Sequence, residues 1–312
     1  MEHLGIIGAG SVGTAIAFAA MSRGVAGRLT LHDLDRARVR AEALDLRHGL
    51  EFMPPAVVEG DDDIAVCSGA DVVVITAGAR QRPGETRRDL AGRNAQLLRS
   101  IVPAVTAVAP GAVLLLVSNP VDVLTHLAIE MTGRDDGTVL GSGTVLDSSR
   151  LRHTLASMYG VAERHVHAHV VGEHGDSETI LWSSARIGGA LLDQIETLEG
   201  RILDAEDRER ISEQVRNAAY EIIAGKGATS WAIALATVQI LRALDQSTNA
   251  SVLPVSALID PALGLGASCV SLPRMVDRRG AGAVLPLGAT EGEMASIRAS
   301  TAAVERALAA LR

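Results

Sequence analysis

A glycine-rich turn near the N-terminus constrains the fold of this chain more than any other feature. Residues 4–7 form a short apolar run, Gly8-Ala-Gly-Ser-Val-Gly13 follows at once, and a small-residue helix is expected from Val12 to Arg23. In the order strand, G-x-G-x-x-G, helix, the glycines allow a tight turn and let backbone N–H groups approach a pyrophosphate. The turn therefore predicts the first βαβ unit of a dinucleotide-binding sheet.

An acidic residue specifies which dinucleotide the turn would bind. Asp33 lies twenty residues after Gly13 and directly follows a second predicted strand, residues 29–32. A carboxylate at this place hydrogen-bonds the adenosine ribose hydroxyls and repels a 2′-phosphate, which favours NAD over NADP. The alternative is a tight turn without a ligand, since 31 glycines allow coincidental matches.

The rest of the first half continues the alternation of strands and helices. The runs at 71–75 and 113–117 have continuously apolar cores, which are typical of strands buried on both faces. Helical patterns at 36–46 and 87–108 lie between the runs. The alternation predicts right-handed βαβ units and an α/β fold of the Rossmann type, a doubly wound parallel sheet.

The second half has a different pattern and is expected to form an α+β substrate-binding domain. We place the boundary near Gly141–Gly143, giving a cofactor domain at 1–142 and a catalytic and oligomerisation domain at 143–312. The final helix is expected to begin at Thr290-Glu-Gly-Glu293, a capping-box spacing. Earlier helices are predicted at 146–159, 205–225 and 230–244, and strands at 165–171, 253–258 and 268–272.

Composition excludes several classes of protein. With 312 residues, of which 47% are hydrophobic, the chain can bury the cores of two domains. Its net charge of −8 makes nucleic acid an unfavourable partner. Two cysteines cannot build a disulfide framework or a four-sulfur zinc site. No apolar run is long enough to cross a membrane, so we expect a cytoplasmic protein.

Polar segments follow the predicted strands, where doubly wound sheets bind ligands. They cover residues 76–87 and 118–122, and a third group combines 146–152 with 172–177. Arginine is suited to binding carboxylates, and histidine to transferring protons near neutral pH. These segments indicate an enzyme for a small anionic substrate. Individually, the arginines could be solvated loop charges, and His174 could belong to a structural turn.

Taken together, these motifs resemble the L-lactate and L-malate dehydrogenase superfamily, and within it the bacterial lactate branch. The resemblance spans essentially the whole chain. It rests on the glycine motif, Thr76-Ala-Gly, the loop through Arg87, Ser118-Asn-Pro-Val-Asp122, Leu146-Asp-Ser-Ser-Arg150, Gly172-Glu-His-Gly-Asp-Ser177 and Gly227-Ala-Thr-Ser-Trp-Ala-Ile233.

The resemblance implies a hydride-transfer enzyme that uses NADH. His174 would donate and accept the proton, and Asp147 would hold its imidazole in place. Arg150 would clamp the substrate carboxylate, Arg87 would polarise the carbonyl from a closing loop, and Asn119 would bond near the substrate oxygen. Further implied substrate contacts are Gln81, Asp122 and Thr229. Implied cofactor contacts are Gly8, Gly10, Val12, Gly13, Asp33, Arg38, Gly78, Ala79, Ser100, Val117, Asn119, Ser142 and Ile233.

Three histidines also invite an interpretation. His165, His167 and His169 alternate along one predicted strand and so share a face. We expect no metal there, because further ligands are not evident, and the simplest interpretation is a half-exposed strand face. The resemblance implies instead that Arg152 and His167 bind fructose 1,6-bisphosphate as an activator in a homotetramer.

Two other functions are alternatives, and the sequence supports them to different degrees. A non-enzymatic NAD-sensing module would be expected to lose His174, Arg150 or Arg87, and all three are present. A dehydrogenase for malate or for a larger 2-hydroxy acid would keep them and differ near Gln81 and Thr229.

The resemblance implies that Gln81 is the position that would separate pyruvate from oxaloacetate. The malate branch usually has arginine there, whereas a neutral glutamine would leave a second substrate carboxylate without an ionic partner, which costs several kcal/mol. Arg80 and Arg82 flank Gln81, but its spacing to Arg87 supports this alignment. We expect Gln81→Arg to raise kcat/KM for oxaloacetate relative to pyruvate, as steady-state kinetics on both acids will show. A higher kcat/KM for oxaloacetate in the unmodified protein would contradict the assignment.

Overall fold

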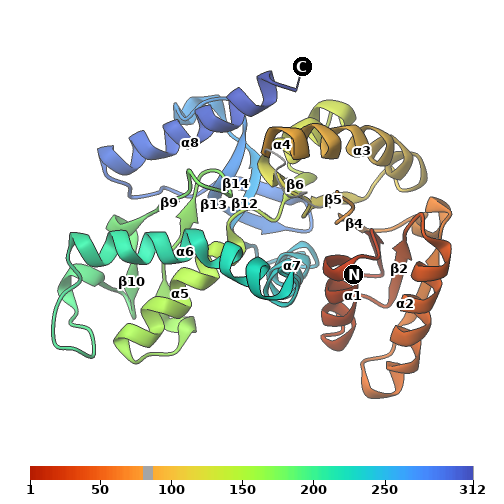
Figure 1. Ribbon diagram of the computed structural model, residues 1–312, viewed down its shortest axis with the longest axis horizontal. Coiled ribbons are helices and arrows are strands. Elements are labelled where there is room, and N and C mark those ends of the chain that lie inside the picture. The colour runs from red at the N-terminus through yellow and green to blue at the C-terminus, as the bar shows by residue number, and fades with distance from the viewer. Residues whose placement is uncertain (80–86, 312) are drawn as a thin grey trace.

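One nine-stranded sheet forms the centre of the molecule (Figure 1). The computed structural model describes residues 1–79 and 87–311, without the side chains of Arg87 and Arg88. The strand order is β3-β2-β1-β4-β5-β6-β12-β13-β14, with β1 to β6 parallel and β12 to β14 antiparallel. Its strands are β1 (His3–Ile7), β2 (Arg28–His32), β3 (Val57–Asp61), β4 (Val72–Ile75), β5 (Val113–Leu116), β6 (Val139–Gly141), β12 (Ser251–Leu258), β13 (Cys269–Asp277) and β14 (Gly280–Val284). The predicted α/β class with a doubly wound parallel sheet is confirmed.

Helices cover both faces of the sheet, which explains why its strands are apolar throughout. Along β5, Leu115 faces one core, while its neighbours Leu114 and Leu116 face the other, and all three side chains are fully buried. The first core includes α1 (Ser11–Ser22), α2 (Arg36–His48) and α7 (Trp231–Leu244). The second includes α3 (Arg87–Val108), α4 (Val121–Thr132) and α8 (Glu291–Ala309).

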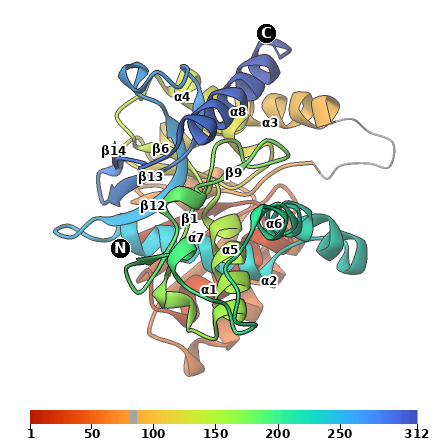
Figure 2. The same cartoon turned by 90° about the vertical axis from the view of Figure 1, so that its left-hand side faces the viewer.

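A third, smaller core is formed by residues of the second half of the chain. It packs α5 (Val145–Tyr159) against α6 (Ala205–Lys226), and Figure 2 shows these two helices close together. Short strands complete this region: β7 (Val166–His167), β8 (Val170–Val171), β9 (Thr179–Ile180), β10 (Arg186–Ile187) and β11 (Ala190–Leu191).

The predicted helices agree with the structure to within a few residues. The capping box at Thr290 and Glu293 is present, with each side chain accepting from the other's backbone N–H. The predicted single strand at 165–171 is wrong. A 3-10 turn at Glu163–His165 precedes two separate short strands, β7 and β8, which pair with different partners. The break arises because β7 and β8 pair with different strands, and the local sequence pattern does not indicate these partners.

The antiparallel strands β12, β13 and β14 follow one another as a meander, and this meander extends the parallel sheet. β12 joins β6 where Ser256 pairs with Gly141. A side chain at Gly141 would place its Cβ 2.4 Å from Thr125 Oγ1, so only glycine allows this close packing. The junction places segments from both halves of the chain next to each other, beside the carboxyl ends of β4, β5 and β6.

Among the helices of the described residues, none is long and apolar enough to span a bilayer.

Candidate active site

The glycine turn is shaped by packing at two positions and open at the third. Gly8 has φ +106°, and its N–H donates to His32 O at 2.8 Å. A Cβ at Gly13 would lie 1.9 Å from Gly8 O. Around Gly10, by contrast, no atom lies within 4 Å of where a Cβ would be. The turn therefore leaves room over the N-terminus of α1, as close approach of a pyrophosphate requires.

Asp33 fixes this turn to the end of β2. Its carboxylate accepts from Ala9 N at 2.7 Å and from Asp35 N at 3.0 Å. The two bonds orient the carboxylate next to the turn, and each oxygen keeps a second acceptor position. This is the arrangement that ribose hydroxyls would need.

Asn94 is a residue that the sequence analysis missed. It is buried on α3, accepts from Ala79 N at 2.7 Å and donates to Asn119 O at 2.7 Å. It thereby joins the segments that follow β4 and β5. A polar residue in the buried stripe of α3 was the available signal, but only tertiary contacts reveal its partners.

The other predicted cofactor residues have different environments. Arg38 is exposed on α2, and Ser100 is exposed on α3 with its hydroxyl donating to Leu97 O at 2.7 Å. Ile233 lies in the first turn of α7, partly buried against the first core. Val12, Gly78, Val117 and Ser142 lie beside the glycine turn or just after β4, β5 and β6.

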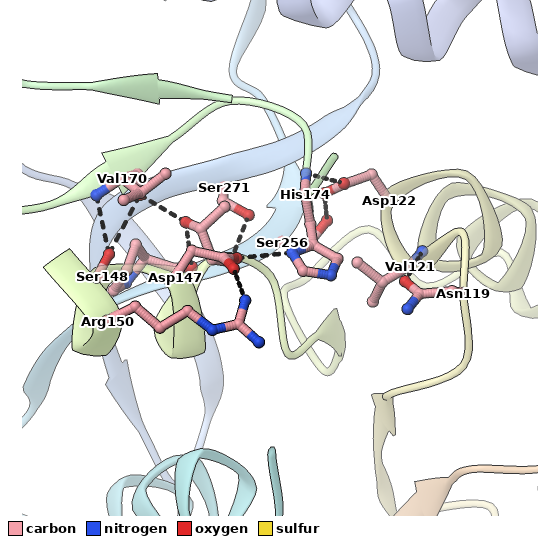
Figure 3. A network of polar contacts seen from close by, with 12 residues as sticks. Asn119, Val121, Asp122, Asp147, Ser148, Arg150, Val170, His174, Ser256 and Ser271 are labelled. Carbon is pink, nitrogen blue, oxygen red and sulfur yellow. Dashed lines mark hydrogen bonds and ion pairs between the residues drawn. The ribbon is translucent and has the colours of Figure 1, made fainter. Parts of the chain in front are cut away.

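The third group of polar segments, 146–152 with 172–177, forms a compact ionic cluster (Figure 3). Asp147 lies in the first turn of α5 and is 2% exposed. One of its carboxylate oxygens bonds His174 Nδ1 at 2.6 Å, and the other accepts from Arg150 Nη1 at 2.7 Å. Nδ1 carries a proton that it donates to this carboxylate, and Nε2 lies on the other side of the ring, away from Asp147. Nε2 is therefore the ring nitrogen that can exchange a proton with a substrate.

Asp122 holds the backbone of the histidine loop. This carboxylate in the first turn of α4 accepts from His174 N at 2.7 Å and from Ser256 Oγ at 2.5 Å. Ser256 lies on β12 and was not predicted. On the far side of the loop, Ser300 of α8 accepts from Glu173 N at 2.6 Å. The loop is thus held between α4 and α8.

Charge and burial shift the pKa values of the cluster in opposite directions. The negative charge of Asp147 raises the pKa of His174 to about 9, against the effect of burial. Although burial opposes it, the charges of His174 and Arg150 lower the pKa of Asp147. His174 is therefore protonated at neutral pH and gives up its proton as pH rises through about 9. Burial raises the pKa of Asp122 to about 6, with Ser256 and the backbone of His174 opposing the shift.

Gln81 lies outside the described residues, as does the side chain of Arg87, whose backbone begins α3. Asn119 is exposed, and Thr229 is half-buried in the link before α7.

Arg152 and His167 line one hollow of about 410 Å³, together with His169 and Arg164. The Arg152 side chain donates to Ala168 O at 3.3 Å, and burial lowers its pKa. Burial, followed by the charges of Arg152 and His167, lowers the pKa of His169 to about 4. The hollow is rich in cationic and imidazole groups, with Glu163 as its acidic member.

Both halves of the chain match profiles of one protein family. Residues 3–141 match the lactate/malate dehydrogenase NAD-binding domain, and residues 144–309 match the α/β C-terminal domain of the same family. The chain belongs to the lactate/malate dehydrogenase family. As a member with this NAD-binding domain, it is an NAD-dependent oxidoreductase.

Individual relatives match this chain over nearly its full length. An L-lactate dehydrogenase of Bifidobacterium animalis is 46% identical over 95% of this chain and 93% of its own. One from Thermus aquaticus is 43% identical, with 99% of each chain covered. Among solved structures, a lactate dehydrogenase from a deep-sea metagenome library has a TM-score of 0.93 at 34% identity, covering 99% of this chain and 98% of its own. A minor L-lactate dehydrogenase of Enterococcus mundtii has a TM-score of 0.92 at 35% identity, covering 100% and 98%.

The glycine turn allows a matched pair of substitutions. Gly13→Ala is expected to lower the free energy of unfolding by about 2–4 kcal/mol, because its methyl group would overlap a backbone oxygen. Gly10→Ala meets open space and should cost at most about 1 kcal/mol, yet weaken NADH binding about tenfold by filling the space for the pyrophosphate. Chemical denaturation and NADH fluorescence titration measure the two effects. Unchanged NADH affinity in a folded Gly10→Ala protein would contradict the placement of the cofactor.

Asp147→Asn removes the charge that keeps His174 protonated. The pKa of His174 should fall from about 9 to its ordinary 6.5 or below. We expect kcat/KM for the 2-oxo acid at pH 7.5 to fall by about 10²-fold or more, and by less at pH 5.5 where His174 regains its proton. The exposed Asp193→Asn is the matched control and should keep the original pH profile. An Asp147→Asn protein that folds normally and keeps that profile would refute this role.

Proposed function

We propose that the protein catalyses the reversible reduction of pyruvate to L-lactate with NADH. The observation that carries the proposal is the 2.6 Å bond between His174 Nδ1 and the buried carboxylate of Asp147. It supports a charged imidazole at neutral pH with Nε2 as the proton donor. The relatives named above, all lactate dehydrogenases, support the same substrate.

Arg150 is the proposed binding partner of the substrate carboxylate. One of its amino groups donates to Asp147, which orients the guanidinium and leaves its other N–H groups to form parallel bonds to a carboxylate. Its side chain is 15% exposed, so bulk water screens such a pair only weakly. Arg150 would thus place the 2-oxo group beside His174.

The cofactor would be held by the glycine turn, Asp33 and the segments after β4 and β5. When bound, NADH supplies the hydride. His174 would supply the proton on its side of the carbonyl, while Arg87 and Asn119 would stabilise the developing negative charge on the oxygen. In the reverse direction, the neutral imidazole of His174 would accept the proton of lactate.

We further propose that a sugar bisphosphate regulates the enzyme at the hollow around Arg152 and His167. Guanidinium and imidazole groups bind phosphate well. A phosphate there would also restore some charge to His169, whose pKa burial lowers to about 4. A homotetramer is the proposed assembly, with this hollow at a subunit interface.

One assay series tests both proposals. NADH oxidation is measured against pyruvate, oxaloacetate and longer 2-oxo acids, each with and without fructose 1,6-bisphosphate. We expect pyruvate to have the highest kcat/KM and the effector to lower its KM, an effect that Arg152→Gln should abolish. Higher kcat/KM for another acid would overturn the pyruvate assignment, and no turnover of any acid would favour a sensing module. Identical pyruvate saturation curves with and without the effector would remove the regulatory site.

A further inference from the structure

A second carboxyl group lies beside the histidine–aspartate pair. Glu178 follows the histidine loop and directly precedes β9. One of its carboxylate oxygens, one of Asp147 and a ring nitrogen of His174 all lie within 4.8 Å of one another. Glu178 falls just outside the sequence motif that ends at Ser177, so no role was predicted for it.

Charged groups face Glu178 from three directions. They are Asp147 and Arg150 from α5, Arg216 from α6, and His174 from its own loop. Burial and then the negative charge of Asp147 raise the pKa of Glu178 to about 8, against the three cations. At neutral pH the side chain is therefore mostly protonated, and it becomes anionic only when the solution is alkaline.

Ionisation of Glu178 would change the net charge where the substrate carboxylate is proposed to bind. With Glu178 neutral, the charges of His174, Arg150, Arg216 and Asp147 sum to two positive charges. An anionic Glu178 halves that net charge and itself repels an anionic substrate. At about 5 Å in a partly buried site, one like charge weakens binding on the order of a hundredfold.

We propose that Glu178 is a positioning residue whose protonation is required for the 2-oxo acid to bind, acting through Arg150 and His174. Binding would then need two protons, one on His174 and one on Glu178, rather than the single proton that the reaction consumes. This inference rests on the proposed function, because it assumes that the substrate carboxylate binds at Arg150.

The test compares the pH dependence of pyruvate KM in the intact protein and in Glu178→Gln. Glutamine keeps the shape of the side chain and removes its titration. With saturating NADH and constant ionic strength, we expect the intact protein to show a KM rising about a hundredfold per pH unit once both groups ionise, and the variant about tenfold per unit. At pH 6, where Glu178 is protonated, kcat and KM of the two proteins should agree within about twofold.

A matched control removes a glutamate that does not face the cluster. Glu213 is exposed on α6, and Glu213→Gln should reproduce the pH profile of the intact protein. Equal steepness in the intact protein and Glu178→Gln would overturn the proposal. A KM for Glu178→Gln that differs more than tenfold from that of the intact protein at pH 6 would also overturn it. The carboxyl group of Glu178 would then be required for its shape and not for its charge.

A second measurement does not depend on the variant folding. Binding of oxamate, an unreactive analogue of pyruvate, to the NADH complex of the intact protein is followed by fluorescence from pH 6 to pH 10. The two-proton requirement predicts the same steep loss of affinity, and a one-proton dependence overturns it. Failure of the proposed function is distinguishable, because it appears as absent pyruvate turnover at pH 6, where Glu178 is protonated.

Discussion

The site depends on one buried carboxylate that serves two cations. Asp147 is 2% exposed, and the bonds to His174 and Arg150 together offset the free energy of removing its charge from water. The same two bonds have chemical consequences, because one determines which ring nitrogen of His174 carries the proton and the other orients the guanidinium of Arg150. Removal of Asp147 would leave two cations facing each other in a partly buried site. A single residue thereby links the stability of the cluster to its protonation state.

The continuity of the sheet places this cluster beside the carboxyl end of β6, on the same sheet that carries the glycine turn. β12, from the second half of the chain, pairs with β6 through Ser256 and Gly141, and Ser256 in turn donates to Asp122. Asp122 then holds the backbone of His174. The contact depends on a glycine at 141, since a larger residue would separate the strands. A chain of short-range bonds therefore runs from the central sheet to His174.

Charge at the site differs from charge over the whole protein. The net charge is −8, yet His174, Arg150 and Asp147 sum to one positive charge at neutral pH. An acidic protein can thus bind a small anion specifically, because burial makes local charges count more than distant ones. Glu178 belongs to the same balance, since its pKa of about 8 lies close to that of His174. Groups that interact this closely titrate together, so the pH dependence belongs to the cluster and not to one residue.

The sequence by itself determined the class of the fold and the glycine turn, and its resemblance to a known family implied that His174, Asp147 and Arg150 share one site. Periodicity and turn residues act over short distances, so strands such as 71–75 and the capped final helix could be read from local pattern. Tertiary structure alone decided that the strand at 165–171 divides, that β12 extends the parallel sheet, and that Asn94, Ser256 and Glu178 reach the site. These features arise from contacts between residues far apart in the chain. Burial, which sets the pKa values of the cluster, exists only once those contacts form.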